Sequence, residues 1–212
     1  IPNKLSEELI EKMLYRIKDH CIKHNLMSFT IILHGGEPLI LGIKYFEFFL
    51  KKSKYILDRA NIKVMYILQT NGTLMTEEWA KFLVKNNINV GFSFDGYESI
   101  HNENRIYKNS EKGSYRDVVK GMNVFKKYYP LHVLSVINTN SDPIRFYKTI
   151  KDLELNSVSL LMQDITYDNF YNVNTMETSE WMIKLFDIWF DDENKNKLTL
   201  LEPFSLIINI IL

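Results

Sequence analysis

The sequence predicts an α/β protein in which strands and helices alternate as βα units around a parallel sheet. Two observations lead to this class. Short, nearly continuous apolar runs alternate with longer segments of helical period, and most of these runs end in an unusual polar group. Strands covered on both faces have continuous apolar sequences, and their alternation with helices indicates βα units around a parallel sheet.

The first element is a helix predicted at about residues 6–23. Its apolar stripe is predicted to contain Leu9, Met13, Ile17 and Cys21, which follow one another at intervals of four residues. This spacing brings side chains to one face of a helix. We therefore expect Cys21 to pack in the core.

Five strands are predicted, at 29–33, 63–68, 89–94, 131–137 and 157–162. Helices separate them, and the starts of three helices can be read from the sequence. Thr76 and Ser114 are each predicted to cap a helix through the side-chain hydroxyl. Pro143 occupies the first turn of a third helix, where its missing N–H is tolerated.

Composition and charge limit the classes of partner. The 212 residues are 46% hydrophobic, enough for one domain or part of a larger one. Twenty-six basic residues balance 26 acidic ones, so charge gives no reason to expect nucleic acid or an anionic membrane as partner. The sequence has neither a transmembrane-length apolar run nor a secretory signal. Because Cys21 is the single cysteine, we expect a cytoplasmic protein.

Polar corners follow the predicted strands. Four strands end in HGGEP (34–38), QTNG (69–72), SFDG (93–96) and INTN (137–140), and the fifth runs into QDITYD (163–168). Turn chemistry explains any one of them, since Asn-Gly and Asp-Gly are ordinary turn pairs. In parallel α/β folds the loops at the carboxyl ends of strands carry function. Together these corners therefore indicate a ligand held at one rim.

The corner after the first predicted strand has the strongest local signal. Gly35 and Gly36 allow positive φ and a close approach of the backbone to a ligand. Their carbonyl groups, together with the Glu37 carboxylate, could accept hydrogen bonds from an ammonium group. The alternative is an ordinary strand-to-helix turn in which Glu37 is solvated.

Four segments, LHGGEPLILG, LQTNGTLM, SFDGYESIHNENR and GSYRDVVKGMNVFKK, carry a resemblance to a known family. In order and spacing the chain resembles radical S-adenosylmethionine (radical SAM) enzymes. The branch it resembles contains anaerobic sulfatase maturases and SPASM-type enzymes that modify ribosomal peptides. The resemblance implies a partial (β/α)6 TIM-like barrel whose first strand is missing. It implies that 1–212 is an incomplete core, with 169–212 leading toward a C-terminal extension.

The resemblance also implies a cofactor site. In this family S-adenosylmethionine chelates the open iron of a 4Fe-4S cluster, and the segment at Gly35, Gly36 and Glu37 would hold its amino group. Ser93 and Arg105 match the serine and arginine that hold its carboxylate, twelve residues apart. A guanidinium offers two parallel donors to a carboxylate, and a hydroxyl adds a third. The alternatives are a surface cation for Arg105 and a buried hydroxyl for Ser93.

Three further positions are candidates on the same resemblance. His34 would face cofactor or substrate, or else it is a satisfied histidine at the end of a strand. Asn71 would point into the barrel, or else it serves the Asn-Gly turn. Met162 would lie beside the adenine. Tyr167 and Asp168 could face substrate.

Two other residues are predicted to have supporting roles. We expect Asp95 to order its own loop rather than to act as a base. We expect His101 to brace the segment that carries Arg105. No catalytic residue and no metal ligand are assigned in this chain.

The chain departs from the family in its cysteines. A cluster of this type needs three closely spaced thiolates, and Cys21 stands alone on a helix. We therefore expect the ligands as CxxxCxxC upstream of Ile1, and we interpret the chain as the excised middle of a larger enzyme. The 212 residues alone are expected to be inactive.

The resemblance implies chemistry for the intact protein. A reduced cluster would cleave S-adenosylmethionine to a 5′-deoxyadenosyl radical, which abstracts hydrogen from a peptide or protein side chain. Crosslinking of a ribosomal peptide is the first hypothesis, and formylglycine formation in a sulfatase is the second. A third, of another class, is a degenerate barrel without a cluster that serves as a binding or scaffold module. A flavodoxin or ferredoxin would be the electron donor.

Overall fold

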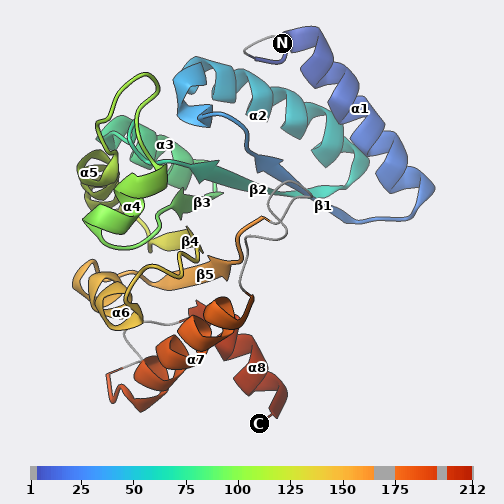
Figure 1. Ribbon diagram of the computed structural model, residues 1–212. Helices are drawn as coiled ribbons and strands as arrows, with labels where there is room; N and C mark the ends of the chain where they lie inside the picture. The colour runs from blue at the N-terminus through green and yellow to red at the C-terminus, as the bar shows by residue number, and fades with distance from the viewer. Residues whose placement is uncertain (1–3, 165–174, 195–199, 212) are drawn as a thin grey trace. The chain divides into compact units, whose positions relative to one another are not determined.

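The structure is a computed structural model that describes residues 4–164, 175–194 and 200–211. Helices and strands alternate along the chain (Figure 1). Strand order in the sheet follows the order of the chain from β1 to β6. The printed strand pairs are all parallel. The predicted α/β class with parallel strands is therefore confirmed. The predicted contacts of Tyr167 and Asp168 lie outside the described residues.

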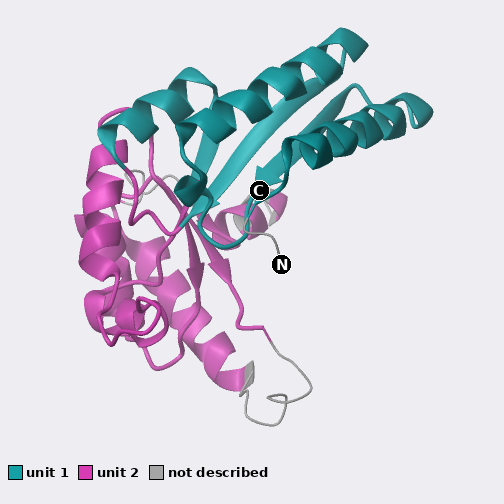
Figure 2. Ribbon diagram, turned by 90° about the horizontal axis from the view of Figure 1, so that it is seen from above, with its two compact units in different colours: residues 1–70, 76–90 teal, residues 71–75, 91–212 magenta. Residues whose placement is uncertain are grey.

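The chain divides into two compact units (Figure 2), and each is described by itself. The first comprises residues 1–70 and 76–90. Its elements are α1 (Glu7–Lys23), β1 (Ser28–Leu33), the 3-10 turn η1 (Pro38–Leu41), α2 (Ile43–Leu57), η2 (Asp58–Ala60), β2 (Lys63–Thr70) and α3 (Glu77–Lys85).

The second unit comprises residues 71–75 and 91–212. It contains the second half of β3 and the elements that follow it. These are β3 (Ile88–Ser93), α4 (Glu98–Asn104), α5 (Tyr115–Phe125), β4 (His132–Val136), α6 (Pro143–Asp152), β5 (Ser157–Leu161), α7 (Thr175–Asp191), β6 (Leu200–Glu202) and α8 (Phe204–Ile211). The five predicted strands are confirmed, with ends shifted by one or two residues, whereas the three-residue β6 was not predicted.

In the first unit, α1 and α2 pack together beside the β1–β2 pair (Figure 1). The buried face of α1 consists of Ile10, Leu14 and Cys21. The predicted burial of Cys21 is confirmed, but Leu9 is 47% exposed, so the predicted stripe is wrong at its first position. The buried residues Ile10 and Leu14 each lie one position further along than the predicted Leu9 and Met13, and a shift of one residue turns a side chain about 100° around a helix.

Aromatic side chains fill the rest of this core. The Phe46 ring meets Trp79 edge to face, with 5.2 Å between ring centroids. Trp79 belongs to α3, whose first turn is capped as predicted, since its backbone N–H donates to the Thr76 hydroxyl over 3.3 Å. Phe49 packs against Tyr66 of β2. These contacts hold the helices against the strands that carry the first loop of the candidate site.

In the second unit, α6 begins at Pro143 as predicted, and the Asp142 carboxylate caps it by accepting from the N–H of Ile144. Ser114 is the N-cap residue of α5, as predicted, but it makes no side-chain cap hydrogen bond, because its hydroxyl is used in another contact. The Asn102 side-chain oxygen instead accepts from the N–H of Tyr115, the first residue of α5.

The end of the described chain packs on this unit as well. The Trp181 indole of α7 donates to the Ser141 carbonyl over 2.9 Å and contacts Phe146 of α6. Phe204 of α8 packs against Phe186 of α7. Within the described parts of the chain, the helices include none that is long and apolar enough to cross a membrane.

Candidate functional site

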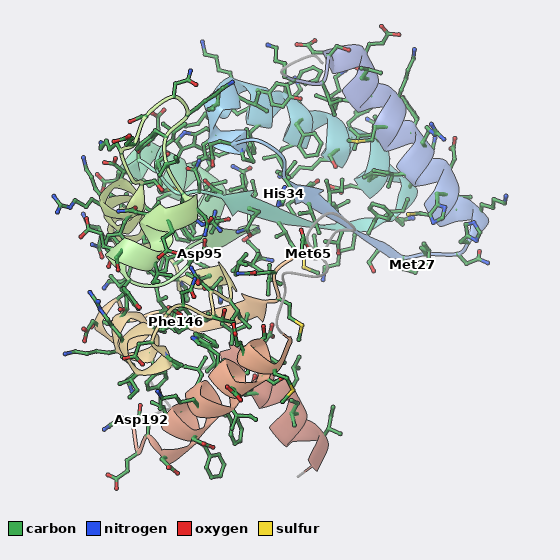
Figure 3. All side chains as sticks on the ribbon, viewed as in Figure 1. Met27, His34, Met65, Asp95, Phe146 and Asp192 are labelled. Atoms are coloured by element: carbon green, nitrogen blue, oxygen red, sulfur yellow. The ribbon has the colours of Figure 1, made fainter. Side chains whose placement is uncertain are left out.

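The loop after β1 has the backbone geometry that its glycines predict. Gly35 has φ +98° and Gly36 has φ +53°, and a Cβ built on either residue meets nothing within 4 Å. The backbone conformation therefore favours glycine, while packing of the described residues does not require it. His34 precedes the pair and is exposed (Figure 3). All three residues border a mainly apolar cavity of ≈ 690 Å³ within the first unit.

The Glu37 carboxylate is fixed rather than solvated. Its Oε1 accepts from the backbone N–H of Leu39 over 3.1 Å, which caps η1. The same oxygen accepts from the hydroxyl of Thr70, the last residue of β2, over 2.7 Å. The alternative of a solvated Glu37 is therefore wrong. Two neighbouring strands hold this negative charge at their carboxyl ends.

In the second unit, Arg105 is paired with Asp95. Arg105 Nε lies 2.5 Å from Asp95 Oδ2, and Nη2 lies 3.0 Å from Oδ1. Asp95 Oδ1 also accepts from the backbone N–H of Val136 over 3.0 Å. A guanidinium carries five N–H donors, and Asp95 uses two of those of Arg105. Arg105 is therefore a clamped cation rather than a loose surface one.

His101 braces this pair, as predicted. Its side chain is fully buried, its Nδ1 accepts from the backbone N–H of Asp95 over 3.3 Å, and its Nε2 lies 3.1 Å from the Ser114 hydroxyl oxygen. Burial, with the Arg105 charge nearby, lowers the pKa of His101 to about 4 although Asp95 opposes the change. The imidazole is therefore neutral at neutral pH. The predicted role of Asp95 in ordering its loop is confirmed by the same contacts.

Arg105 borders a cavity of ≈ 640 Å³ that also contains Asp95, Asn138, Leu161 and Met162 in its lining. The structure thus brings Arg105 and Met162 to one cavity of the second unit. Met162 is 68% exposed. Asn138 is buried, and its amide donates to Glu103 over 2.7 Å. Ser93 is half-buried at the end of β3 and is not among the lining residues.

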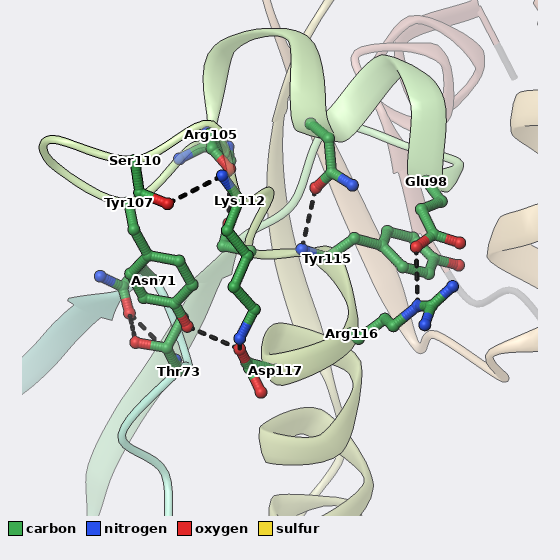
Figure 4. Close-up of polar contacts among 12 residues, drawn as sticks. Asn71, Thr73, Glu98, Arg105, Tyr107, Ser110, Lys112, Tyr115, Arg116 and Asp117 are labelled. Atoms are coloured by element: carbon green, nitrogen blue, oxygen red, sulfur yellow. Dashed lines mark hydrogen bonds and ion pairs between the residues drawn. The ribbon is translucent and has the colours of Figure 1, made fainter.

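Asn71 has the role of a turn residue. Its side-chain oxygen accepts from the backbone N–H of Thr73 over 2.9 Å and from the Thr73 hydroxyl over 2.8 Å (Figure 4). These two hydrogen bonds support the alternative that Asn71 serves the turn.

The segment after Arg105 is a hairpin fastened to α5. Ile106 and Gly113 form an antiparallel bridge. The Tyr107 hydroxyl donates to Asp117 over 2.8 Å, and the Lys112 ammonium lies 3.2 Å from the same carboxylate oxygen (Figure 4). Sequence reasoning missed this latch, because a Tyr-Asp pair ten residues apart has no recognisable motif. Asn138, by contrast, lies in the INTN corner that the sequence singled out.

The cysteines do not fit an iron–sulfur cluster. The chain has one, Cys21, and it is buried in α1. Over residues 4–164, 175–194 and 200–211, no group of three or more His, Cys, Asp or Glu side chains could hold a metal ion. Three thiolates for a cluster would have to come from outside these 212 residues.

The chain matches one protein-family model and is similar in sequence to several known proteins. Residues 2–153 match the model of the Radical SAM superfamily. The Cysteine-type anaerobic sulfatase-maturating enzyme of Clostridium novyi (strain NT) is 29% identical over 98% of this chain and 55% of that protein. The Serine-type enzyme of Bacteroides thetaiotaomicron is 32% identical over 71% of this chain and 36% of that protein. The chain spans about half the length of the first relative.

The chain is also similar to solved structures. Native anSMEcpe with bound AdoMet and Kp18Cys peptide superposes with a TM-score of 0.84 at 26% identity, over 98% of this chain and 58% of that one. Streptococcus suis SuiB superposes with a TM-score of 0.58 at 15% identity, over 90% of this chain and 42% of that one, which shows a shared fold alone.

Proposed function

The chain belongs to the radical SAM superfamily, and from that premise we propose that it is the core of an enzyme that oxidises a side chain of a peptide or protein. Sulfatase maturation now comes before peptide crosslinking among the two hypotheses. The similarity to a sulfatase-maturating enzyme extends over 98% of the chain at 29% identity. SuiB, at 15% identity, supports the fold only.

The observation that carries the cofactor assignment is the clamped guanidinium of Arg105. A carboxylate ligand is bound best by donors in a fixed planar arrangement. Asp95 fixes the guanidinium of Arg105 by accepting hydrogen bonds from its Nε and Nη2 groups. We propose that the remaining donors of Arg105, with the hydroxyl of Ser93, bind the carboxylate of S-adenosylmethionine. Met162, in the lining of the same cavity, is proposed to contact the adenine.

For the amino group, we propose the loop at Gly35, Gly36 and Glu37. An ammonium group needs acceptors, and this loop offers the carbonyl groups of two exposed glycines beside a carboxylate that Thr70 holds in place. The open space around both glycines leaves room for a ligand against the backbone. His34 and Asn71 are also proposed to contact the cofactor or the substrate.

The chemistry that the cofactor supplies when bound is hydrogen-atom abstraction from carbon. The residues of this chain bind and orient it and exclude water; the cofactor carries the reaction. The residues present do not fit the cluster, so the proposal requires three cysteines outside the 212 residues. It also requires a one-electron donor, for which we propose a flavodoxin or a ferredoxin.

The test uses the full-length enzyme, reconstituted anaerobically with iron and sulfide, and supplies it with S-adenosylmethionine, dithionite and peptides that contain cysteine or serine. We expect 5′-deoxyadenosine to form, with S-adenosylmethionine as the net oxidant. Mass spectrometry should show a cysteine whose sulfur has left as sulfide and been replaced by an aldehyde oxygen from water. A product that has lost two hydrogens and kept its sulfur would favour crosslinking. No 5′-deoxyadenosine from a protein with an intact cluster would contradict the enzyme proposal, and a full-length protein that takes up no cluster would favour the scaffold alternative.

A further inference from the structure

We infer that His101 and Ser114 are positioning residues for Arg105 and that they set its guanidinium for the carboxylate of the cofactor. The inference rests on the proposed function, because it assumes that Arg105 binds that carboxylate. Neither residue borders the cavity that Arg105 lines. Their effect must therefore pass through Arg105 itself.

The hydrogen bonds run in one direction through the imidazole. The Asp95 N–H is a donor, so His101 Nδ1 must accept, and the neutral ring then carries its hydrogen on Nε2. Nε2 donates to the Ser114 oxygen over 3.1 Å, and the Ser114 hydroxyl donates to the Arg105 carbonyl over 2.9 Å. Along this series, each group is fixed as donor or acceptor by the group before it.

The two ends of the series hold two parts of Arg105. At one end, Asp95 is fixed through its backbone, and its carboxylate grips the guanidinium. At the other, Ser114 holds the Arg105 carbonyl through its hydroxyl and also through its backbone N–H, over 3.0 Å. The Arg105 N–H in turn donates to the His101 carbonyl. Main chain and side chain of Arg105 are thus both tied to His101.

The surroundings of the ring favour this neutral, rigid form. The Phe94 and Tyr115 rings lie 5.2 and 5.8 Å from it, centroid to centroid. The charged groups that act on it are Asp95 and Arg105. A proton on Nδ1 would meet the hydrogen of the Asp95 amide and would add a positive charge beside Arg105. The network therefore operates with His101 uncharged.

The experiment measures the affinity of S-adenosylmethionine by calorimetry in the reconstituted full-length enzyme, with cluster content checked spectroscopically. Arg105→Ala should weaken binding about 30-fold or more, as for a truncated charged hydrogen-bond pair. His101→Phe keeps a ring and loses both bonds, and it should weaken binding about tenfold. Ser114→Ala should weaken binding about threefold. This variant tests the same series of hydrogen bonds without placing a phenylalanine in the core.

The decisive measurement combines the substitutions. If His101 acts through Arg105, His101→Phe should change the affinity less than twofold in the Arg105→Ala background. His132→Phe is a matched control, since it removes another His–Ser pair of the same unit, His132 Nδ1 to Ser157 over 2.6 Å, and should leave the affinity unchanged. His101→Asn keeps an acceptor near the position of Nδ1. If it restores the affinity, the hydrogen bond from the Asp95 N–H contributes more to the position of Arg105 than the bond to Ser114.

The outcomes separate the inference from the proposed function. An affinity within twofold of wild type for Arg105→Ala would remove Arg105 from the cofactor site and overturn both. Weak binding by Arg105→Ala together with normal binding by His101→Phe and Ser114→Ala would overturn the inference alone. Equal losses from His101→Phe in both backgrounds would also overturn it, because a general structural defect does not depend on Arg105.

Discussion

Thr70 donates its hydroxyl hydrogen to Glu37 Oε1 over 2.7 Å, and so the last residue of β2 fixes the carboxylate that follows β1. Thr70 is 2% exposed, and Glu37 is half-buried. A hydrogen bond to a carboxylate in such a place is stronger than one between neutral groups. The orientation of Glu37 therefore depends on a residue 33 positions away in the sequence.

The first prediction tests this bond. Thr70→Val keeps the shape of the side chain and removes the donor, so it should lower the free energy of unfolding by about 1–3 kcal/mol. It should also weaken S-adenosylmethionine binding several-fold, because Glu37 can then turn away. Thr70→Ser keeps the hydroxyl and should be close to wild type. Denaturant unfolding and calorimetry measure the two effects, and equal affinities for Val and Ser variants would show that Glu37 is held without Thr70.

The second prediction separates two reasons for Gly36. Its φ of +53° suits asparagine tolerably and valine badly, while both add a Cβ in open space. Gly36→Val should abolish 5′-deoxyadenosine formation in the full-length enzyme. If a ligand approaches the backbone here, Gly36→Asn should also bind S-adenosylmethionine at least tenfold more weakly, although it keeps the fold. Normal binding by Gly36→Asn would mean that the glycine serves the turn only.

The fold could be predicted because its signals are local. Five strands are continuous apolar runs that end in polar corners, and each is confirmed within two residues. Pro143 and Thr76 mark helix starts through their own backbone preferences. The three residues of β6 carry no comparable signal, since so short a strand depends on its pairing with β5.

The errors arise where tertiary contacts compete with local preference. Ser114 has the residue type of a helix cap, but its hydroxyl is taken by Arg105 and His101, and Asn102 replaces it. For Arg105 the resemblance implied the carboxylate of S-adenosylmethionine as partner, which stays a prediction. The sequence could not show that Asp95 already uses two of the donors, because the pairing depends on how the loop folds back.

The third prediction concerns pH. The pKa of His101 falls from 6.5 in the unfolded chain to about 4 in the folded protein. Between these values the unfolded state binds a proton that the folded state does not, so stability falls as pH decreases from about 6.5 to about 4. The loss should total roughly 3 kcal/mol.

Denaturant unfolding over this pH range measures that loss. His101→Gln should flatten the pH dependence by about the same amount. Burial lowers the pKa of His132 too, so His132→Gln is the control and should flatten the curve less. Parallel curves for wild type and His101→Gln would contradict the prediction.

The last prediction concerns Gly113, which closes the hairpin after Arg105. A Cβ at this position would lie 2.0 Å from Asn102 Cγ, so Gly113→Ala must displace that side chain. The Asn102 oxygen accepts from the first N–H of α5, and its movement would uncap the helix. We expect Gly113→Ala to lower the free energy of unfolding by about 1–3 kcal/mol, through overpacking and the lost bond.

A double-mutant cycle identifies the cause. Asn102→Ala alone should cost about 1 kcal/mol, the value of a helix cap. When it is combined with Gly113→Ala the clash is gone, so the double variant should be clearly more stable than the sum of the single effects predicts. Ser110→Ala, on the exposed turn of the same hairpin, is the matched control and should change stability by less than about 0.5 kcal/mol. Additive costs for Gly113→Ala and Asn102→Ala would mean that the two side chains do not compete for the same space.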